Sequence, residues 1–196
     1  MKRMCIYILF ASLVIMPYAA AAEIPTSVES TIILKPYTII TEPAALNAHL
    51  EETPLSPPLR TALLYYYATI NRPDMMQVLV TMGANPNGYF LIGDSKTPLL
   101  ARVILESASA DTSRILLEAG ANPNAVVEME GSLPVSMFLW AAKFAKHEQI
   151  IDALLNAGAD PSGELLGLNA VDMIGLNRYL KNTPAVIKVR QATVKK

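Results

Sequence analysis

The sequence predicts an all-α fold built from a recurring helical unit rather than around a single closed core. Three near-copies of one short phrase carry this prediction: Gly83-Ala84-Asn85-Pro86-Asn87, Gly120-Ala121-Asn122-Pro123-Asn124 and Gly158-Ala159-Asp160-Pro161-Ser162. The copies are 37 and 38 residues apart, and an apolar run with helical spacing precedes each of them. Units of this length that recur along a chain are typical of stacked folds, in which neighbours bury each other's apolar faces.

The residues of each phrase indicate that a helix ends there. Glycine at 83, 120 and 158 suits the left-handed conformation that commonly follows a helix C-terminus. The Asn-Pro or Asp-Pro pair that follows disfavours further helix and starts a turn. We therefore expect a positive φ at Gly120 and at its two counterparts.

A further helix is expected ahead of each of these helices. Thr97-Pro98 has the form of a helix start, with threonine at the cap and proline at the first helical position. Similar starts are expected near Thr61, Ser136 and Asn169. Each unit thus consists of two helices followed by the phrase, and the units together span residues 58–180.

This pattern is similar to the ankyrin repeat, which has a Thr-Pro-Leu helix start, a Leu-Leu helix and a Gly-Ala-Asp/Asn turn. The resemblance covers three full units and a partial fourth. These units are four or five residues longer than the family's usual period of about 33, and the histidine that usually follows Thr-Pro-Leu is replaced by leucine. The resemblance implies a helical-repeat solenoid whose β-hairpin fingers lie at residues 88–96 and 125–135.

The segments on either side of the units have a different character. Residues 23–57 contain five prolines and form the predicted irregular N-terminal cap, since the end of a stack needs a cover. Within it we expect extended segments at 31–34 and 37–40 and a short helix at 42–50. Residues 181–196 form a basic C-terminal tail, which we expect to be solvated and partly disordered.

The first 22 residues are predicted to be a signal peptide. Lys2 and Arg3 precede an apolar run that is short for a membrane span, and Ala20-Ala21-Ala22 supplies a small-residue cleavage pattern. We expect cleavage after Ala22 and a periplasmic location; the alternative is that the segment remains as an uncleaved anchor. Cleavage removes Cys5, the only cysteine, which excludes disulfides and thiolate sites.

Charge is distributed unevenly along the chain. Residues 23–177 hold 8 basic and 17 acidic side chains, a net charge of −9, whereas residues 178–196 hold six basic side chains and no acidic one. An acidic body argues against nucleic acid as a partner, because phosphate contacts need a basic face. The basic tail is a candidate for weak contact with a membrane surface or with an acidic partner.

No catalytic or metal-binding pattern is found. His49 and His147 are far apart in sequence, and neither has the neighbourhood of a zinc site. There is no nucleophile elbow and no glycine-rich phosphate loop. We therefore expect no catalytic residues, no cofactor, no metal and no small-molecule substrate.

Apolar residues in the predicted fingers are the candidate binding site. Large apolar side chains on a projecting turn are exposed unless something packs on them. The candidate partner-binding residues are Tyr89, Phe90, Leu91, Val127 and Met129 in the fingers, with Tyr65 and Tyr66 on a first helix. The alternative for the fingers is that they fold back on each other, and for the tyrosines that the N-terminal cap covers them. Trp140 is expected in the core.

These observations favour an exported protein-binding module whose partner is another protein of the cell envelope. It would bind and restrain that partner, in one version as an immunity-type inhibitor of an antibacterial toxin. The alternatives are an accessory protein that supports a periplasmic stress-defence enzyme, or a hydrolase whose site the sequence does not reveal.

Overall fold

The computed structural model describes residues 24, 28–92, 94–106, 109–128 and 131–194. The predicted signal peptide and Met129 lie outside the described residues. The described part of the chain is mostly helical, with short antiparallel hairpins. Its helices are α2 (Val28–Thr38), α3 (Pro43–Glu52), α4 (Pro57–Thr69), α5 (Pro73–Thr81), α6 (Leu99–Glu106), α7 (Ala110–Glu118), α8 (Met137–Phe144), α9 (Glu148–Asn156), α10 (Ala170–Leu176) and α11 (Ala185–Val194).

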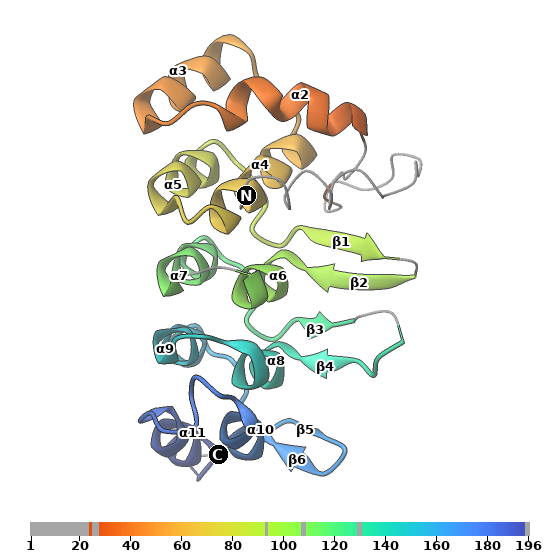
Figure 1. Cartoon of the computed structure of the whole chain (residues 1–196), viewed down its shortest axis with the longest axis vertical. Helices are drawn as coiled ribbons and strands as arrows, with labels where there is room; N and C mark the ends of the chain where they lie inside the picture. Colours follow the sequence, from red (N-terminus) through yellow and green to blue (C-terminus); the bar gives the residue numbers. More distant parts are fainter. Residues whose placement is uncertain (1–23, 25–27, 93, 107–108, 129–130, 195–196) are drawn as a thin grey trace.

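The helices are arranged in pairs that lie one above another (Figure 1). Within a pair, α4 packs on α5, α6 on α7, α8 on α9 and α10 on α11. Between pairs, α4 contacts α6, α6 contacts α8 and α8 contacts α10, while α5, α7, α9 and α11 form a second column in the same way. Each helix therefore buries its apolar face against its own partner and against the next pair.

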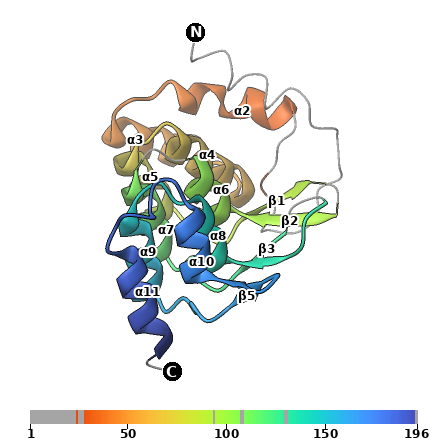
Figure 2. The same cartoon turned by 60° about the horizontal axis from the view of Figure 1, so that its bottom comes forward.

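Three hairpins project from one side of the helices (Figures 1 and 2). They are β1 (Tyr89–Ile92) with β2 (Ser95–Pro98), β3 (Val126–Val127) with β4 (Val135–Ser136), and β5 (Glu164–Leu165) with β6 (Leu168–Asn169). We call them hairpins 1, 2 and 3. A hydrogen bond joins hairpin 1 to hairpin 2: the Thr97 hydroxyl donates to the Glu128 carbonyl at 2.7 Å. Hairpins 1 and 2 lie where the sequence predicts hairpins, at residues 88–96 and 125–135.

The three phrases end helices as predicted. The φ angles of Gly83, Gly120 and Gly158 are 82°, 93° and 84°, which confirms the expected left-handed conformation. After α7, the N–H of Gly120 donates to Leu117 and the N–H of Ala121 donates to Leu116. These bonds occupy carbonyls that the end of the helix leaves without a partner.

The N-terminal segment differs from the prediction. The two expected extended segments, 31–34 and 37–40, were wrong, because most of this stretch belongs to helix α2, which continues through Pro36. The expected helix at 42–50 is confirmed as α3. Packing explains the difference: α2 contacts α4 and α3 contacts α5, so the segment continues both helix columns and gains tertiary contacts that local propensity does not report.

The C-terminal segment is also more ordered than expected. The expectation of a solvated, partly disordered tail was wrong for residues 185–194, which form helix α11. Ala185 and Val189 are buried on one side of this helix, and the Lys188 amine lies 2.7 Å from the Asp152 carboxylate on α9. Packing on α9 and α10 offsets the entropy of ordering a short helix that is marginal when isolated.

Candidate protein-docking surface

Hairpin 1 has one buried face and one partly open face. Tyr89 pairs with Pro98 and Phe90 pairs with Thr97 in the antiparallel register. Because successive side chains of a strand point to opposite faces, Phe90 and Thr97 turn inward together, where they are 6% and 0% exposed. The Phe90 ring lies edge-on to Tyr65, 4.8 Å between centroids.

Several predicted docking residues are therefore part of the core. The expectation that Phe90 and Val127 are exposed was wrong, since both are buried, and Val127 is only 1% exposed. Tyr65 is buried as well, at 9%. Trp140 is buried as expected, and its indole N–H donates to the Ala101 carbonyl at 2.9 Å.

Tyr66 is held by the N-terminal segment rather than displayed. Its hydroxyl donates to the Thr38 carbonyl at 3.2 Å, and the Tyr67 hydroxyl beside it donates to the Tyr37 carbonyl at 2.6 Å. The structure therefore agrees with the alternative, in which the N-terminal cap segment covers these tyrosines. Among the described residues of the predicted site, Tyr66, Tyr89 and Leu91 are partly exposed.

A polar cluster lies beside Tyr65. Its hydroxyl donates to the Glu106 carboxylate, which also pairs with Arg102 at 2.7 Å. Burial is the main cause that raises the pKa of the Tyr65 phenol, and the bond to Glu106 adds to it. The Arg102 guanidinium also lies over the Phe90 ring, 5.6 Å from its centroid. Each charge in this cluster is matched by a neighbour, so the cluster stabilises the packing of hairpin 1 on α4 and α6.

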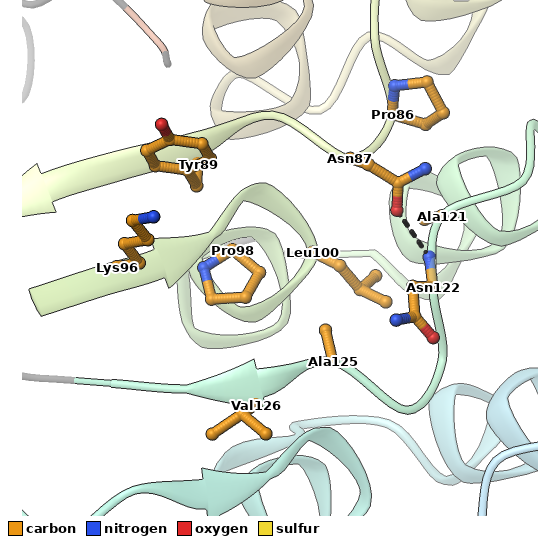
Figure 3. A pocket seen from close by; sticks show the side chains of 10 residues that line it. All are labelled: Pro86, Asn87, Tyr89, Lys96, Pro98, Leu100, Ala121, Asn122, Ala125 and Val126. Carbon is orange, nitrogen blue, oxygen red and sulfur yellow. Dashed lines mark hydrogen bonds between the residues drawn. The ribbon is translucent and has the colours of Figure 1, made fainter. Parts of the chain in front are cut away.

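A shallow pocket of about 240 Å³ lies between hairpins 1 and 2 (Figure 3). Its lining comes from two successive phrases, from the hairpins and the residue before β3, and from the first turn of α6: Pro86, Asn87, Tyr89, Lys96, Pro98, Leu100, Ala121, Asn122, Ala125 and Val126. The Lys96 amine lies 5.3 Å from the centre of the Tyr89 ring. Among the described residues that line the pocket, Lys96 alone is charged, so the pocket suits an apolar side chain accompanied by an acceptor or an anion.

Exposed apolar side chains gather on hairpins 2 and 3. Among the described residues of these hairpins, four large apolar side chains expose at least a third of their surface, namely Val126, Leu133, Leu166 and Leu168. Single exposed leucines are ordinary on protein surfaces, but exposed apolar residues on successive projecting turns are typical of a docking surface. Together with the pocket, these residues define the candidate docking surface.

Leu166 is the most unusual member of this set. It occupies the two-residue turn of hairpin 3 with a φ of 52°, followed by Gly167 at 77°, and it is 83% exposed. Turns with two positive φ angles strongly favour Asn-Gly or Gly-Gly, because a branched side chain in the left-handed region costs about 1–2 kcal/mol. Our sequence reasoning missed this residue. The signal available was Leu166-Gly167 between Leu165 and Leu168, shortly after the third phrase, where a third hairpin would be expected.

The described residues contain no group of three or more His, Cys, Asp or Glu side chains arranged to hold a metal ion. The His49 ring, on α3, packs against Tyr37, 4.8 Å between centroids, whereas His147 is the residue before α9. A separate finding is that no helix in the described part of the chain has both the length and the apolar character that a membrane crossing needs.

Comparison with known proteins assigns neither a family nor a function to this chain. No protein-family model matches the chain, and no curated protein matches it significantly. Burial, charge and backbone geometry of this molecule are therefore the support for what we propose.

Proposed function

We propose that this chain is an exported, ankyrin-like helical-repeat module that binds another protein through its hairpins. Three observations support the fold: the three phrases, the stacked helix pairs and the hairpin after each phrase. Such a stack leaves a long surface whose side chains contribute little to the core, which is why repeat folds serve as binding scaffolds. The charged, apolar and small-residue pattern of residues 1–22 supports export to the periplasm.

The observation that carries the proposal is the exposed, left-handed Leu166. An asparagine or glycine there would relieve the backbone, yet the chain has a leucine whose side chain is almost fully in water. Backbone strain of this kind is found at functional sites, where the side chain is needed for another purpose. Burying a leucine in a partner's pocket contributes roughly 1.5–3 kcal/mol, enough to offset that strain.

The other exposed residues extend the contact along the hairpins. Val126 borders the pocket between hairpins 1 and 2, and Leu133 and Leu168 add apolar area on hairpins 2 and 3. Tyr89 and Lys96 supply an aromatic ring and a cation at the same pocket. In protein interfaces a few anchor residues carry most of the binding energy, and the other contacts mainly add complementarity.

Site-specific photo-crosslinking tests this proposal in the cell that makes the protein. A photoreactive amino acid at position 166, and separately at 133, is expected to capture one and the same partner. The matched control places it at Glu118, which is exposed on α7 in the second helix column. Capture at 118 but not at 166 or 133 would move the binding surface to the opposite side of the molecule.

The captured partner then decides between versions of the function. If the role is that of an immunity-type inhibitor, the partner is a toxin, and a stoichiometric amount of this chain stops its activity. The variant Leu166→Asn should weaken that inhibition by roughly tenfold or more, since each 1.4 kcal/mol lost is a factor of ten. Inhibition that survives both Leu166→Asn and Leu133→Ser unchanged would contradict the docking surface.

A further inference from the structure

Hairpin 3 is the last in the row of hairpins (Figure 1), and it displays two leucines. Leu166 at the turn is 83% exposed, and Leu168 on β6 is 38% exposed. Leu168 directly precedes Asn169, which pairs with Glu164 across the hairpin. Glu164 is exposed as well, so a carboxylate stands beside this apolar part of the docking surface.

A second carboxylate lies at the same place. The Asp172 side chain on α10 accepts the Asn169 N–H at 3.1 Å, so Glu164 and Asp172 are both neighbours of Asn169. Asp172 is also exposed, and neither carboxylate forms an ion pair with a described residue. Residues 147–177 contain five acidic side chains and no Lys or Arg. The negative charge beside the two leucines is therefore not offset from within this segment.

The ion pairs of the described residues lie away from hairpin 3. They are found on the helices and at a helix start: Arg72 with Asp74, Arg102 with Glu106, Arg114 with Asp111 and Glu118, and Lys188 with Asp152. Among the described hairpin residues Lys96 alone is a cation, and it belongs to hairpin 1, at the other end of the row (Figure 1). Hairpin 3 thus combines exposed apolar area with uncompensated negative charge.

We propose that the partner docks on hairpin 3 with a basic face, in which an apolar pocket receives Leu166 and Lys or Arg side chains around that pocket pair with Glu164 and Asp172. This inference rests on the proposed function and names the chemistry of the partner's surface. Carboxylates that lose water against an apolar surface cost free energy, whereas a cation at the rim of the contact compensates them. Burial of the leucine then supplies binding energy, while the charges speed association and exclude acidic partners.

Other occupants suit hairpin 3 less well. Nucleic acid and anionic lipid surfaces would bring phosphate groups against the two carboxylates, which is unfavourable. A second copy of this chain could offer the basic segment 178–194, but that contact would join two different surfaces. Such head-to-tail contacts either close into rings or continue into open filaments, and an open filament leaves hairpin 3 of its last copy uncovered. The experiments below detect self-association.

Selection from a phage-displayed library of random peptides tests the proposal without a known partner. The purified protein is the bait, and the folded variant Leu166→Asn/Glu164→Lys removes the peptides that bind elsewhere on the molecule. We expect the remaining peptides to carry apolar residues flanked by Lys or Arg. Enrichment of acidic or uncharged peptides would overturn the proposal, and so would a selection in which no peptide prefers the wild type.

The partner captured by crosslinking at position 166 provides the quantitative test. Its association rate should fall as the salt concentration rises. Glu164→Gln should weaken its affinity about two- to fivefold, the range for an exposed ion pair, and Glu164→Lys should weaken it by roughly tenfold or more. Glu52→Gln and Glu52→Lys, at an exposed position on α3, make the same changes in net charge and are the matched controls. Circular dichroism checks that each variant is folded.

A failure of this inference differs from a failure of the proposed function. A partner that is captured at 166 and 133, but binds Glu164→Lys as tightly as the wild type, leaves the docking surface in place and overturns the basic face. If no partner is captured, the proposed function is contradicted and this inference with it. A dimer or larger assembly in sedimentation velocity that Glu164→Lys abolishes and Glu52→Lys does not also overturns the proposal, because a second copy then occupies hairpin 3.

Discussion

Asn87 joins the first two phrases through its side chain: its Oδ1 accepts the N–H of Asn122 at 2.7 Å, and its Nδ2 donates to the Gly120 carbonyl at 2.9 Å. Asn124 repeats the same pair of bonds, to the N–H of Asp160 at 2.7 Å and to the Gly158 carbonyl at 3.1 Å. The last residue of one phrase thus satisfies two backbone groups of the next. This explains why asparagine, with both a donor and an acceptor, ends the first two copies.

The variant Asn87→Ala should lower the free energy of unfolding by about 0.5–1.5 kcal/mol, because it removes two hydrogen bonds that are exposed, so that water can take the place of the lost partner. Asn87→Asp should cost at least as much, since it keeps an acceptor for Asn122 but sets a carboxylate oxygen against the Gly120 carbonyl. Urea unfolding measures both. Asn156→Ala, at the exposed end of α9, is the control and should change stability little. Equal losses in all three variants would mean that the bridge carries no stability of its own.

Gly120→Val should lower stability by about 1–3 kcal/mol, because valine is forced into a left-handed backbone conformation. A Cβ at this position would meet no atom within 4 Å, so the cost comes from the backbone alone. Gly158→Val should lower stability by a similar amount for the same reason. Thermal melts provide the measurement.

The control for these changes is Gly175→Ala on α10, where a Cβ also meets nothing within 4 Å and the φ is not positive. Here alanine should stabilise by up to about 1 kcal/mol, because glycine is a poor helix former. A loss at Gly175 comparable with that at Gly120 would point to the added bulk rather than to the backbone conformation.

Leu166→Asn should raise the melting temperature while it weakens binding. Asparagine tolerates the left-handed region, and Asn-Gly is the preferred sequence for a two-residue hairpin turn, so a gain of about 1 kcal/mol is expected. Leu168→Asn, on the same hairpin but in the strand β6, is the comparison and should not stabilise. A lower melting temperature for Leu166→Asn would show that the leucine supports the fold, and the strain argument would fail.

Tyr67→Phe should destabilise the contact between the N-terminal segment and α4 by about 1–3 kcal/mol. The hydroxyl donates to the carbonyls of Tyr37 at 2.6 Å and Ile40 at 3.1 Å, and the side chain is fully buried. Hydrogen exchange should become faster in α2 and α3 before it does so in α8. Tyr179→Phe, at an exposed tyrosine, is the control. Uniform acceleration along the chain would show that the segment unfolds only with the whole molecule.

The ion pair between Arg72 and Asp74 should make the free energy of unfolding depend on pH under acidic conditions. The hydrogen bond from Arg72 is the main cause that lowers the pKa of the Asp74 carboxyl in the folded protein. A folded pKa below the unfolded one gives a stabilisation that is complete above the unfolded value of about 3.9 and is lost as pH falls through the folded value. The stability difference between the wild type and Asp74→Asn should therefore be constant from about pH 7 to 5 and shrink below about pH 4.

This difference should stay below about 1 kcal/mol, because the pair is partly exposed and screened by solvent. Asp94→Asn, which removes an exposed carboxylate on hairpin 1, is the matched control. A difference for Asp74→Asn that grows as the pH falls would have the wrong sign and would contradict the assignment.

The sequence by itself determined where the helices end and how often the unit recurs. Gly120 and its counterparts need little tertiary information, because glycine followed by Asn-Pro or Asp-Pro stops a helix through local backbone chemistry. The short helix at 42–50 could also be predicted, and so could the burial of Trp140. The helix follows from a local pattern, and the burial of Trp140 from its position in a first helix of the repeat that the sequence resembles.

Only the tertiary structure decided which side chains the hairpins display. Phe90 and Tyr89 are neighbours with similar character, and a shift of one residue in strand register would exchange their roles. The helical state of α2 and α11 was decided in the same way, since each is short and is held by its neighbours in the stack. The exposed Leu166 depends on a hairpin turn formed by residues 165–168, whose left-handed backbone no local pattern of leucine predicts. Burial and register arise from contacts between distant segments, and a single sequence does not state those contacts.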